Sequence, residues 1–254
     1  NLGRLKYVTA NWTGIDDHMA VLGDLIELSL RNNFRAPVNP VFILAYPVSD
    51  SIVTRVAMSY GLSTNPHALD PTKLASFPWI ADASDTASRI RVGFLSSAFS
   101  DNGVGKHLEK WKFWAMCAAH AGIECFVLST GPHTQGGGTT PLLSALKTLV
   151  GEKKVIELPR DAGSKANAEA IRSLRLHILL DLNGYTEGEQ PELVRAQGRS
   201  APLQALFYGY EGTYGDATAF DYLLTDTTTG VPELTGTLPR LVPETAEGGS
   251  EKGE

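Results

Sequence analysis

The chain has 254 residues, of which 43% are hydrophobic and 20% are charged, so it can bury a sizeable core. Its formal net charge of −6 argues against nucleic acid as a partner, because nucleic-acid-binding proteins usually carry a basic face. No apolar run approaches the roughly twenty residues needed to cross a bilayer, so we expect no membrane partner.

The N-terminal residues 1–61 are predicted to form a small helical unit. Apolar residues recur at helical spacing over residues 16–31, behind two aspartates in the first turn. After a short apolar segment, VFILAY, a second helix is expected over residues 49–60, ending at Gly61. Residues 62–88 carry three prolines and are predicted to be a connector.

Strand-like and helical patterns alternate over residues 89–232. Apolar runs at 89–97, 124–129 and 155–158 alternate with helical patterns at 107–120, 141–150 and 164–174. Three further runs, HILLDL, LQALFY and FDYLLTD, are each bounded by small or polar residues and are typical of buried strands in a parallel sheet. The sequence therefore predicts an α/β protein with a Rossmann-like parallel sheet, preceded by the small helical unit. The acidic, Gly-rich residues 233–254 are predicted to be a disordered tail.

Two cysteines are too few for a disulfide framework. Cys117 falls on a predicted helix and Cys125 in a predicted strand, so we expect both to be buried free thiols. Such thiols fit a reducing, intracellular compartment.

The loops that follow the strands HILLDL and LQALFY are the predicted binding site. Ligands of open α/β sheets bind beyond the carboxyl ends of the strands. These two loops combine glycine, which permits close backbone approach, with Tyr and Thr hydroxyl groups. The candidate binding residues are Asn183, Gly184, Tyr185, Thr186, Tyr210, Gly212 and Thr213. Alternatively, Tyr185 and Thr186 cap a helix that begins near Glu189.

His107 begins a predicted helix just after the loop of the first strand. It can hydrogen-bond a sugar or a phosphate or carry a proton, or it is simply a surface histidine at a helix start. His177 begins a buried strand and is predicted to be a hydrogen-bonded structural histidine. The six histidines are scattered and no common metal or nucleotide motif occurs, so we expect no metal site.

Four motifs in order resemble the catalytic region of protein O-GlcNAc transferases, glycosyltransferase family 41. They are RVGFLSSAF with His107 downstream, LHILLDLNGYTEG, RSAPLQALFYGYEGTYG and DYLLTD. The resemblance implies a GT-B enzyme, in which two Rossmann-like lobes face each other across a cleft. Such enzymes transfer N-acetylglucosamine from UDP-GlcNAc to Ser or Thr hydroxyl groups of proteins, without a metal or other cofactor.

The resemblance also implies roles and partners. This chain corresponds to the first lobe, with His107 as a catalytic residue and the two loops lining the acceptor and sugar side. A C-terminal lobe with most of the uridine and diphosphate contacts, and upstream TPR helices, are expected in the full-length protein. The implied location is cytoplasmic or nuclear, and the implied partners are protein acceptors and a nucleotide sugar.

Several positions depart from the family pattern, Ser200 and Tyr214 among them, and three others put the activity in question. Gly103 stands where the family has a histidine, Ala98 where it has an aspartate, and Glu211 where it has a proline. Without the proline the loop is less constrained, and a carboxylate beside a diphosphate repels it. These departures motivate an alternative hypothesis, a catalytically inactive Rossmann-lobe remnant or interaction module. In either case we expect the isolated chain to be incomplete and inactive.

Overall fold

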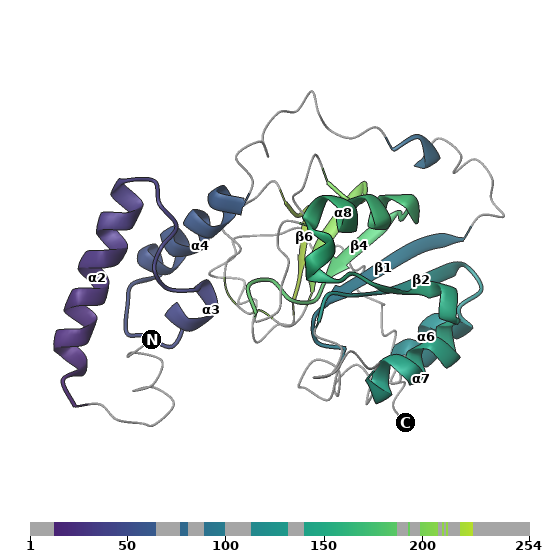
Figure 1. Cartoon of the computed structure of the whole chain (residues 1–254), viewed down its shortest axis with the longest axis horizontal. Coiled ribbons are helices and arrows are strands. Elements are labelled where there is room, and N and C mark those ends of the chain that lie inside the picture. The colour runs from purple at the N-terminus through teal and green to yellow at the C-terminus, as the bar shows by residue number, and fades with distance from the viewer. Residues whose placement is uncertain are drawn as a thin grey trace, which may run out of the picture. The chain divides into compact units, whose positions relative to one another are not determined.

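The computed structural model describes residues 13–64, 77–80, 89–99, 113–131, 140–186, 193, 199–207, 210, 212 and 219–225. Six parallel strands form one sheet in the order β3-β2-β1-β4-β5-β6, the strand order of Rossmann folds (Figure 1). The strands are β1 (Ile90–Ser96), β2 (Ile123–Ser129), β3 (Val155–Glu157), β4 (Ile178–Asp181), β5 (Leu203–Phe207) and β6 (Tyr222–Leu224). The prediction of an α/β, Rossmann-like parallel sheet is confirmed.

Alternate residues of the strands face opposite sides of the sheet, and helices cover both sides. Val92 and Phe94 of β1 join a buried cluster with α6 (Phe113–Ala119) and α7 (Pro141–Val150). The opposite side of the sheet, which includes Leu95 and Leu179, packs against α8 (Ser164–Ser173). Figure 1 shows α6 and α7 near β2 and α8 over β4. Burial on both sides explains why the central strands are almost continuously apolar.

Among the described residues, three α-helices precede the sheet: α2 (Ile15–Arg31), α3 (Pro40–Ile43) and α4 (Asp50–Thr64). The first matches its prediction, and α3 begins where the Asn39 side chain accepts a hydrogen bond from the Val41 backbone N–H at 2.8 Å. The second predicted helix was wrong at its end, because α4 continues through Gly61. A glycine inside a helix costs only about 1 kcal/mol, which the rest of the helix offsets.

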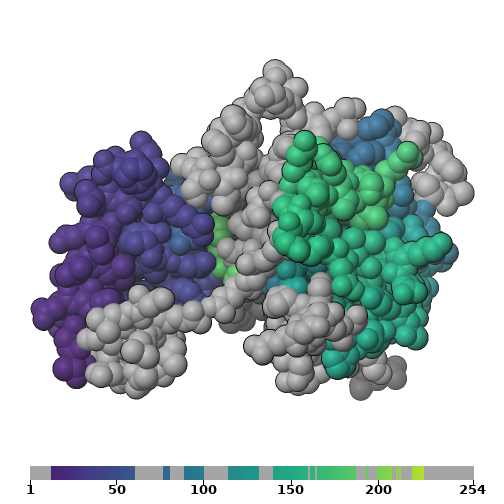
Figure 2. Space-filling view, viewed as in Figure 1, coloured from purple at the N-terminus to yellow at the C-terminus, as the bar shows by residue number. Residues whose placement is uncertain are grey.

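Helix α2 turns one apolar stripe inward and leaves a second one at the surface. Ile26 is fully buried in the same cluster as Leu179 of the sheet. Val21, Leu25 and Leu28, one helical turn apart from each other, are all exposed. Figure 2 shows α2, in the darkest purple, at the surface of the molecule. Among the described residues, the inward stripe and the ion pair from Arg55 Nη1 to Glu27 Oε1, at 2.6 Å, both anchor the helix.

The last apolar run forms an edge strand, so the prediction that it is buried was wrong. In the described part of the chain β6 pairs only with β5, whereas β4 and β5 each lie between two strands. Its residues Tyr222, Leu223 and Leu224 are between 42% and 49% exposed. An apolar run indicates a strand, but its neighbours decide how deeply it is buried.

The prediction of two free thiols was also wrong, since Cys117 and Cys125 form a disulfide. Cys117 lies on α6 and Cys125 on β2, as predicted, and their Cα atoms are 6.3 Å apart. This distance is within the range that a disulfide spans. The thiol argument for a reducing compartment therefore no longer applies, and the predicted location stays a prediction.

The proposed boundaries at residues 61, 88 and 232 also stay predictions. Most of the connector and the whole of residues 233–254 lie outside the described residues. No helix in the described ranges has the length and apolar character that spanning a bilayer requires.

Candidate functional site

Successive strands are added on one side of β1 up to β3 and on its other side from β4 onward, so the direction of the strand order changes between β1 and β4. The loop that follows β1 and the loop that follows β4 therefore lie side by side. Beyond the carboxyl ends of the strands, such a switch point is where open α/β sheets bind their ligands. Ser96 ends β1 and Asp181 ends β4, and the backbone N–H of Leu182 donates to Leu95 O at 2.9 Å. We call this end of β1 and β4, with the loops that follow β4 and β5, the carboxyl edge.

The side chain of Asn183 joins the two strands at the carboxyl edge. Its Oδ1 atom accepts hydrogen bonds from Ser96 Oγ at 3.0 Å, from the Ser97 backbone N–H at 3.0 Å and from Ser97 Oγ at 3.2 Å. The Asn183 backbone N–H donates to the buried carboxylate of Asp181 at 2.9 Å. The side-chain oxygen Oδ1 of Asn183 is thus hydrogen-bonded within the protein, and these bonds fix the start of the loop.

A tight turn follows over Asn183–Thr186. The Thr186 backbone N–H donates to Asn183 O at 3.1 Å, and Gly184 has a φ of 56°, in the left-handed region that favours glycine. A Cβ atom at Gly184 would lie 2.5 Å from Tyr210 Cβ. Glycine therefore permits both the turn and the close approach of the loop after β5.

The structure brings the two predicted loops together through their tyrosines. Tyr185 is fully buried, and its ring meets that of Tyr210 edge to face, with centroids 5.5 Å apart. A Cβ atom at Gly212 would lie 2.6 Å from Tyr210 Oη. The Tyr185 and Tyr210 rings thus shape the loops from within, whereas Thr186 and Gly212 are only half-buried. Contact of any of these residues with a ligand stays a prediction.

Two of the predicted site residues, His107 and Thr213, lie outside the described residues, as do Gly103 and Glu211. Sequence reasoning missed Ser96 and Ser97 as site residues. Their signal was a pair of hydroxyl residues directly after the first strand, at the edge where ligands bind. Within the described ranges no group of three His, Cys, Asp or Glu residues could hold a metal ion.

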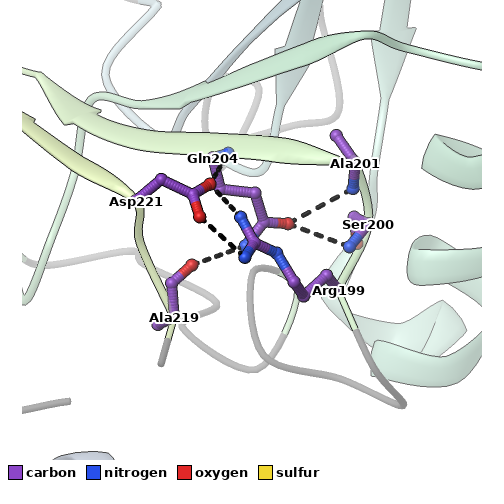
Figure 3. A network of polar contacts seen from close by, with 6 residues as sticks. All are labelled: Arg199, Ser200, Ala201, Gln204, Ala219 and Asp221. Carbon is purple, nitrogen blue, oxygen red and sulfur yellow. Dashed lines mark hydrogen bonds and ion pairs between the residues drawn. The ribbon is translucent and has the colours of Figure 1, made fainter. Parts of the chain in front are cut away.

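A second polar network lies at the opposite end of the sheet, where β5 and β6 begin (Figure 3). The fully buried Gln204 accepts from the Ser200 backbone N–H at 2.9 Å and the Ala201 backbone N–H at 3.3 Å, and donates from Nε2 to Ala219 O at 2.7 Å. Its backbone N–H donates to Asp221 Oδ2 at 2.8 Å. We call this network, with the starts of the strands, the amino edge.

Arg199 completes the amino edge with a bidentate ion pair to Asp221, in which Nη1 lies 2.9 Å from Oδ1 and Nη2 contacts Oδ2. Its carbonyl oxygen accepts from Arg172 Nε at 3.1 Å and Nη2 at 2.8 Å. Burial alone would raise the pKa of Asp221, but the hydrogen bonds from Arg199 and the Gln204 backbone outweigh it and hold that pKa below its ordinary value of 3.8.

His177 has the structural role predicted for it, also at the amino edge. Its Nδ1 atom accepts a hydrogen bond from the Arg91 backbone N–H at 2.9 Å, which requires the neutral ring. Burial, and then the positive charge of Arg91, lower the pKa of His177 below 6.5. The histidine therefore links β4 to β1 as a neutral acceptor.

Comparison with known proteins supports one family. The family model for glycosyl transferase family 41 matches residues 9–238. A probable UDP-N-acetylglucosamine–peptide N-acetylglucosaminyltransferase SEC of Arabidopsis thaliana is 26% identical over 220 residues, covering 85% of this chain and 21% of that protein. The UDP-N-acetylglucosamine–peptide N-acetylglucosaminyltransferase of Caenorhabditis elegans is 26% identical over 225 residues, covering 87% of this chain and 18% of that protein.

A solved structure supports the same fold. The chain is similar to a mutant O-GlcNAc transferase of Thermobaculum terrenum, with a TM-score of 0.54 and 20% identity. The similarity covers 71% of this chain and 31% of that chain. The 254 residues thus span about a fifth of the length of the curated relatives they match.

Proposed function

Because this chain belongs to glycosyltransferase family 41, we propose that it forms one wall of the active site of a protein glycosyltransferase. The donor is UDP-GlcNAc and the acceptor is a Ser or Thr hydroxyl group of a protein. The names of the two curated relatives support this donor and a peptide acceptor. The observation that carries the proposal is the meeting of the Asn183–Thr186 turn with Tyr210 at the carboxyl edge.

The reaction is an inverting group transfer. The acceptor oxygen forms a bond to the anomeric carbon of GlcNAc while the bond from that carbon to the UDP oxygen breaks, and the hydroxyl proton passes to a base or to solvent. The transfer requires the two reactants to be held in line, which rigid loops achieve. No metal ion or other cofactor takes part in the proposed reaction.

Residues of this chain take the acceptor and sugar side of that arrangement. The Asn183–Thr186 turn and the loop of Tyr210, Gly212 and Thr213 present backbone groups and hydroxyls to the ligand. His107 is the proposed catalytic residue, on the strength of its match to the family motif. Stabilisation of the leaving diphosphate falls to a second lobe outside the 254 residues.

Transfer from radiolabelled UDP-GlcNAc tests this proposal. The gene's full-length product should label Ser- and Thr-containing peptides or itself, and His107→Ala should label them more slowly. Absence of label in every peptide and in the protein itself would contradict the proposal.

A second measurement concerns the chain alone. Since the chain spans about a fifth of its curated relatives, we propose that it lacks the donor-binding lobe. Calorimetry with the 254-residue chain should give no measurable UDP binding. A micromolar affinity would overturn this part of the proposal.

The second candidate function is a non-enzymatic lobe that serves interaction. Two observations favour it. Asn183 Oδ1 is hydrogen-bonded within the protein and the Tyr185 ring is buried, and Glu211 stands where the family has a proline. A full-length product that is folded and yet neither binds UDP nor transfers the sugar would select this candidate over the enzyme.

A further inference from the structure

Three tyrosine rings form a continuous row from helix α4 to the carboxyl edge. Tyr60 of α4 meets Tyr185 edge to face, with centroids 5.8 Å apart and an angle of 81° between the rings. Tyr185 in turn meets Tyr210, at 5.5 Å and 87°. All three are buried, with exposed fractions of 6%, 0% and 6%. Edge-to-face pairs of this kind prefer a definite geometry, so each ring restrains the next.

The row leaves little room where it reaches the loops. A Cβ atom at Gly184 would lie 2.8 Å from Tyr210 Cγ, and one at Gly212 would lie 2.6 Å from its hydroxyl oxygen and 3.2 Å from Leu44 Cδ1. The Tyr210 side chain therefore lies close to the backbone at both Gly184 and Gly212, and a side chain of the N-terminal unit, Leu44, lies beside Gly212. A shift of this ring must move at least one of these backbones, because close-packed interiors transmit displacements.

The segment between α2 and α3 holds Tyr60, the first ring of the row, in place on α4. The Arg35 guanidinium lies over the Tyr60 ring, with Cζ 3.7 Å from the centroid, a cation–π contact. The Ala36 backbone N–H donates to Ser59 Oγ at 3.0 Å, next to Tyr60 in the chain. The Tyr185 hydroxyl reaches the Ala57 carbonyl oxygen of the same helix at 3.3 Å, which is long for such a bond. Ring packing, together with this hydrogen bond, therefore links α4 to the loops.

We propose that Tyr60 is a positioning residue for glycosyl transfer, holding the Asn183–Thr186 turn and the Tyr210 loop through the row of rings. The proposal rests on the proposed function for its catalytic consequence, but the positioning of the loops does not depend on it. In this proposal Tyr60 acts through its contact with Tyr185 and not by binding the substrate. The N-terminal helices are thereby part of the machinery of the site rather than an appendage to it.

The first test measures the loops without any activity. Hydrogen exchange of the backbone amides of Asn183–Thr186 and Tyr210 is compared in the 254-residue chain and three variants. Tyr60→Leu removes the ring, Tyr60→Phe keeps it, and Val53→Ala is the matched control, because Val53 lies on α4 and packs against the same cluster.

Tyr60→Leu should speed exchange in both loops by about three- to tenfold, which corresponds to the free energy of one lost aromatic pair. Tyr60→Phe should exchange as the unchanged chain does, and Val53→Ala should leave the loops unchanged although it loses stability. Equal loop exchange in Tyr60→Leu and Val53→Ala overturns the proposal. If Tyr60→Leu does not fold, Tyr60→Met, whose longer and more flexible side chain adapts better to the space of the lost ring, is judged by the same criterion.

The second test uses the gene's full-length product with UDP-GlcNAc and an acceptor peptide. Tyr60→Leu should lower kcat at least tenfold while the KM for UDP-GlcNAc changes little, and Tyr60→Phe should restore kcat. An unchanged kcat in Tyr60→Leu overturns the catalytic part of the proposal. If the unchanged protein transfers no sugar, the proposed function fails, and hydrogen exchange alone decides whether the row positions the loops.

Discussion

Buried polar groups gather at both edges of this sheet, but they are used differently. At the amino edge Gln204 and Arg199 bond to the strands and loops around them, and the bonds join β5, β6 and the segment before β5. At the carboxyl edge Asn183 links β4 to β1. Beyond it, the glycines of the two loops, Gly184 and Gly212, both lie close to the Tyr210 side chain. In the proposed enzyme the first edge stabilises the fold and the second edge handles the ligand. Substitutions at the two edges should therefore separate stability from activity.

The largest effect on stability is expected for Gln204→Leu at the amino edge. Leucine leaves the Ser200 and Ala201 N–H groups and the Ala219 carbonyl oxygen without their partner. Buried groups that lose their hydrogen bonds cost about 1–3 kcal/mol each, so we expect a loss of about 3–5 kcal/mol in the free energy of unfolding. Urea denaturation of the 254-residue chain measures this free energy. A loss below about 1 kcal/mol would show that the network does not stabilise the fold.

The next effect is expected for Gly184→Ala at the carboxyl edge. The new Cβ atom meets Tyr210 and the positive φ strains alanine, so stability should fall by about 1–3 kcal/mol. In the full-length product the displaced turn should also slow sugar transfer by about a hundredfold.

The matched control for Gly184→Ala is Gly163→Ala. Gly163 has a φ of 80° but no atom within 4 Å of an added Cβ, and it lies at the start of α8. It should lose a similar amount of stability while its transfer rate per folded molecule stays near that of the unchanged protein. A transfer rate that falls equally in both variants would mean that backbone strain anywhere, and not the carboxyl edge, is what matters.

A smaller, pH-dependent effect is expected at His177. Its pKa is lowered in the folded state, so the unfolded chain binds a proton more readily, and stability should fall as the pH drops below about 6.5. Protonation removes the acceptor of the Arg91 N–H. Unfolding at about pH 7.5 and pH 5.5 should show this loss in the unchanged chain and not in His177→Asn, which keeps an acceptor but does not titrate. Equal pH dependence in both chains would exclude His177 as its source.

The smallest effect is expected at Asp221, whose pair with Arg199 is partly exposed. Its pKa is lowered in the folded state, so the pair stabilises the fold above about pH 3.8, and this contribution is lost as the pH falls through the folded pKa. Between about pH 5 and pH 3 the unchanged chain should lose more thermal stability than Asp221→Asn. A variant that loses as much would show that other carboxylates account for acid unfolding.

Periodicity and composition predicted the architecture because the sheet is buried on both sides. The runs that became β1, β2 and β4 are mostly apolar, as is typical of strands in a parallel sheet that helices cover on both sides. The exposure of β6 was not predictable, because an edge strand and a central strand have the same local pattern. The disulfide was missed because the packing of α6 on β2, and not the spacing of Cys117 and Cys125, brings their Cα atoms together.

The site was predictable in part. The glycines of the two loops indicated close approach, and the structure brings Gly184, Tyr210 and Gly212 together. The sequence did not show that Tyr185 packs inward against Tyr60, since these residues are 125 positions apart and none of the four motifs includes Tyr60. Nor did it reveal that Ser96 and Ser97 both donate hydrogen bonds to the side-chain oxygen Oδ1 of Asn183. Contacts between distant segments depend on the packing of the whole fold.

The division between the two edges is tested most directly by the transfer rate per folded molecule in the gene's full-length product. Labelled UDP-GlcNAc, an acceptor peptide and the variants Gly184→Ala and Gln204→Leu suffice, with each protein held well below its unfolding temperature. We expect Gly184→Ala to transfer about a hundredfold more slowly and Gln204→Leu to stay within about threefold of the unchanged protein. Equal losses in the two variants, or a larger loss in Gln204→Leu, would contradict the assignment of the carboxyl edge as the active-site wall.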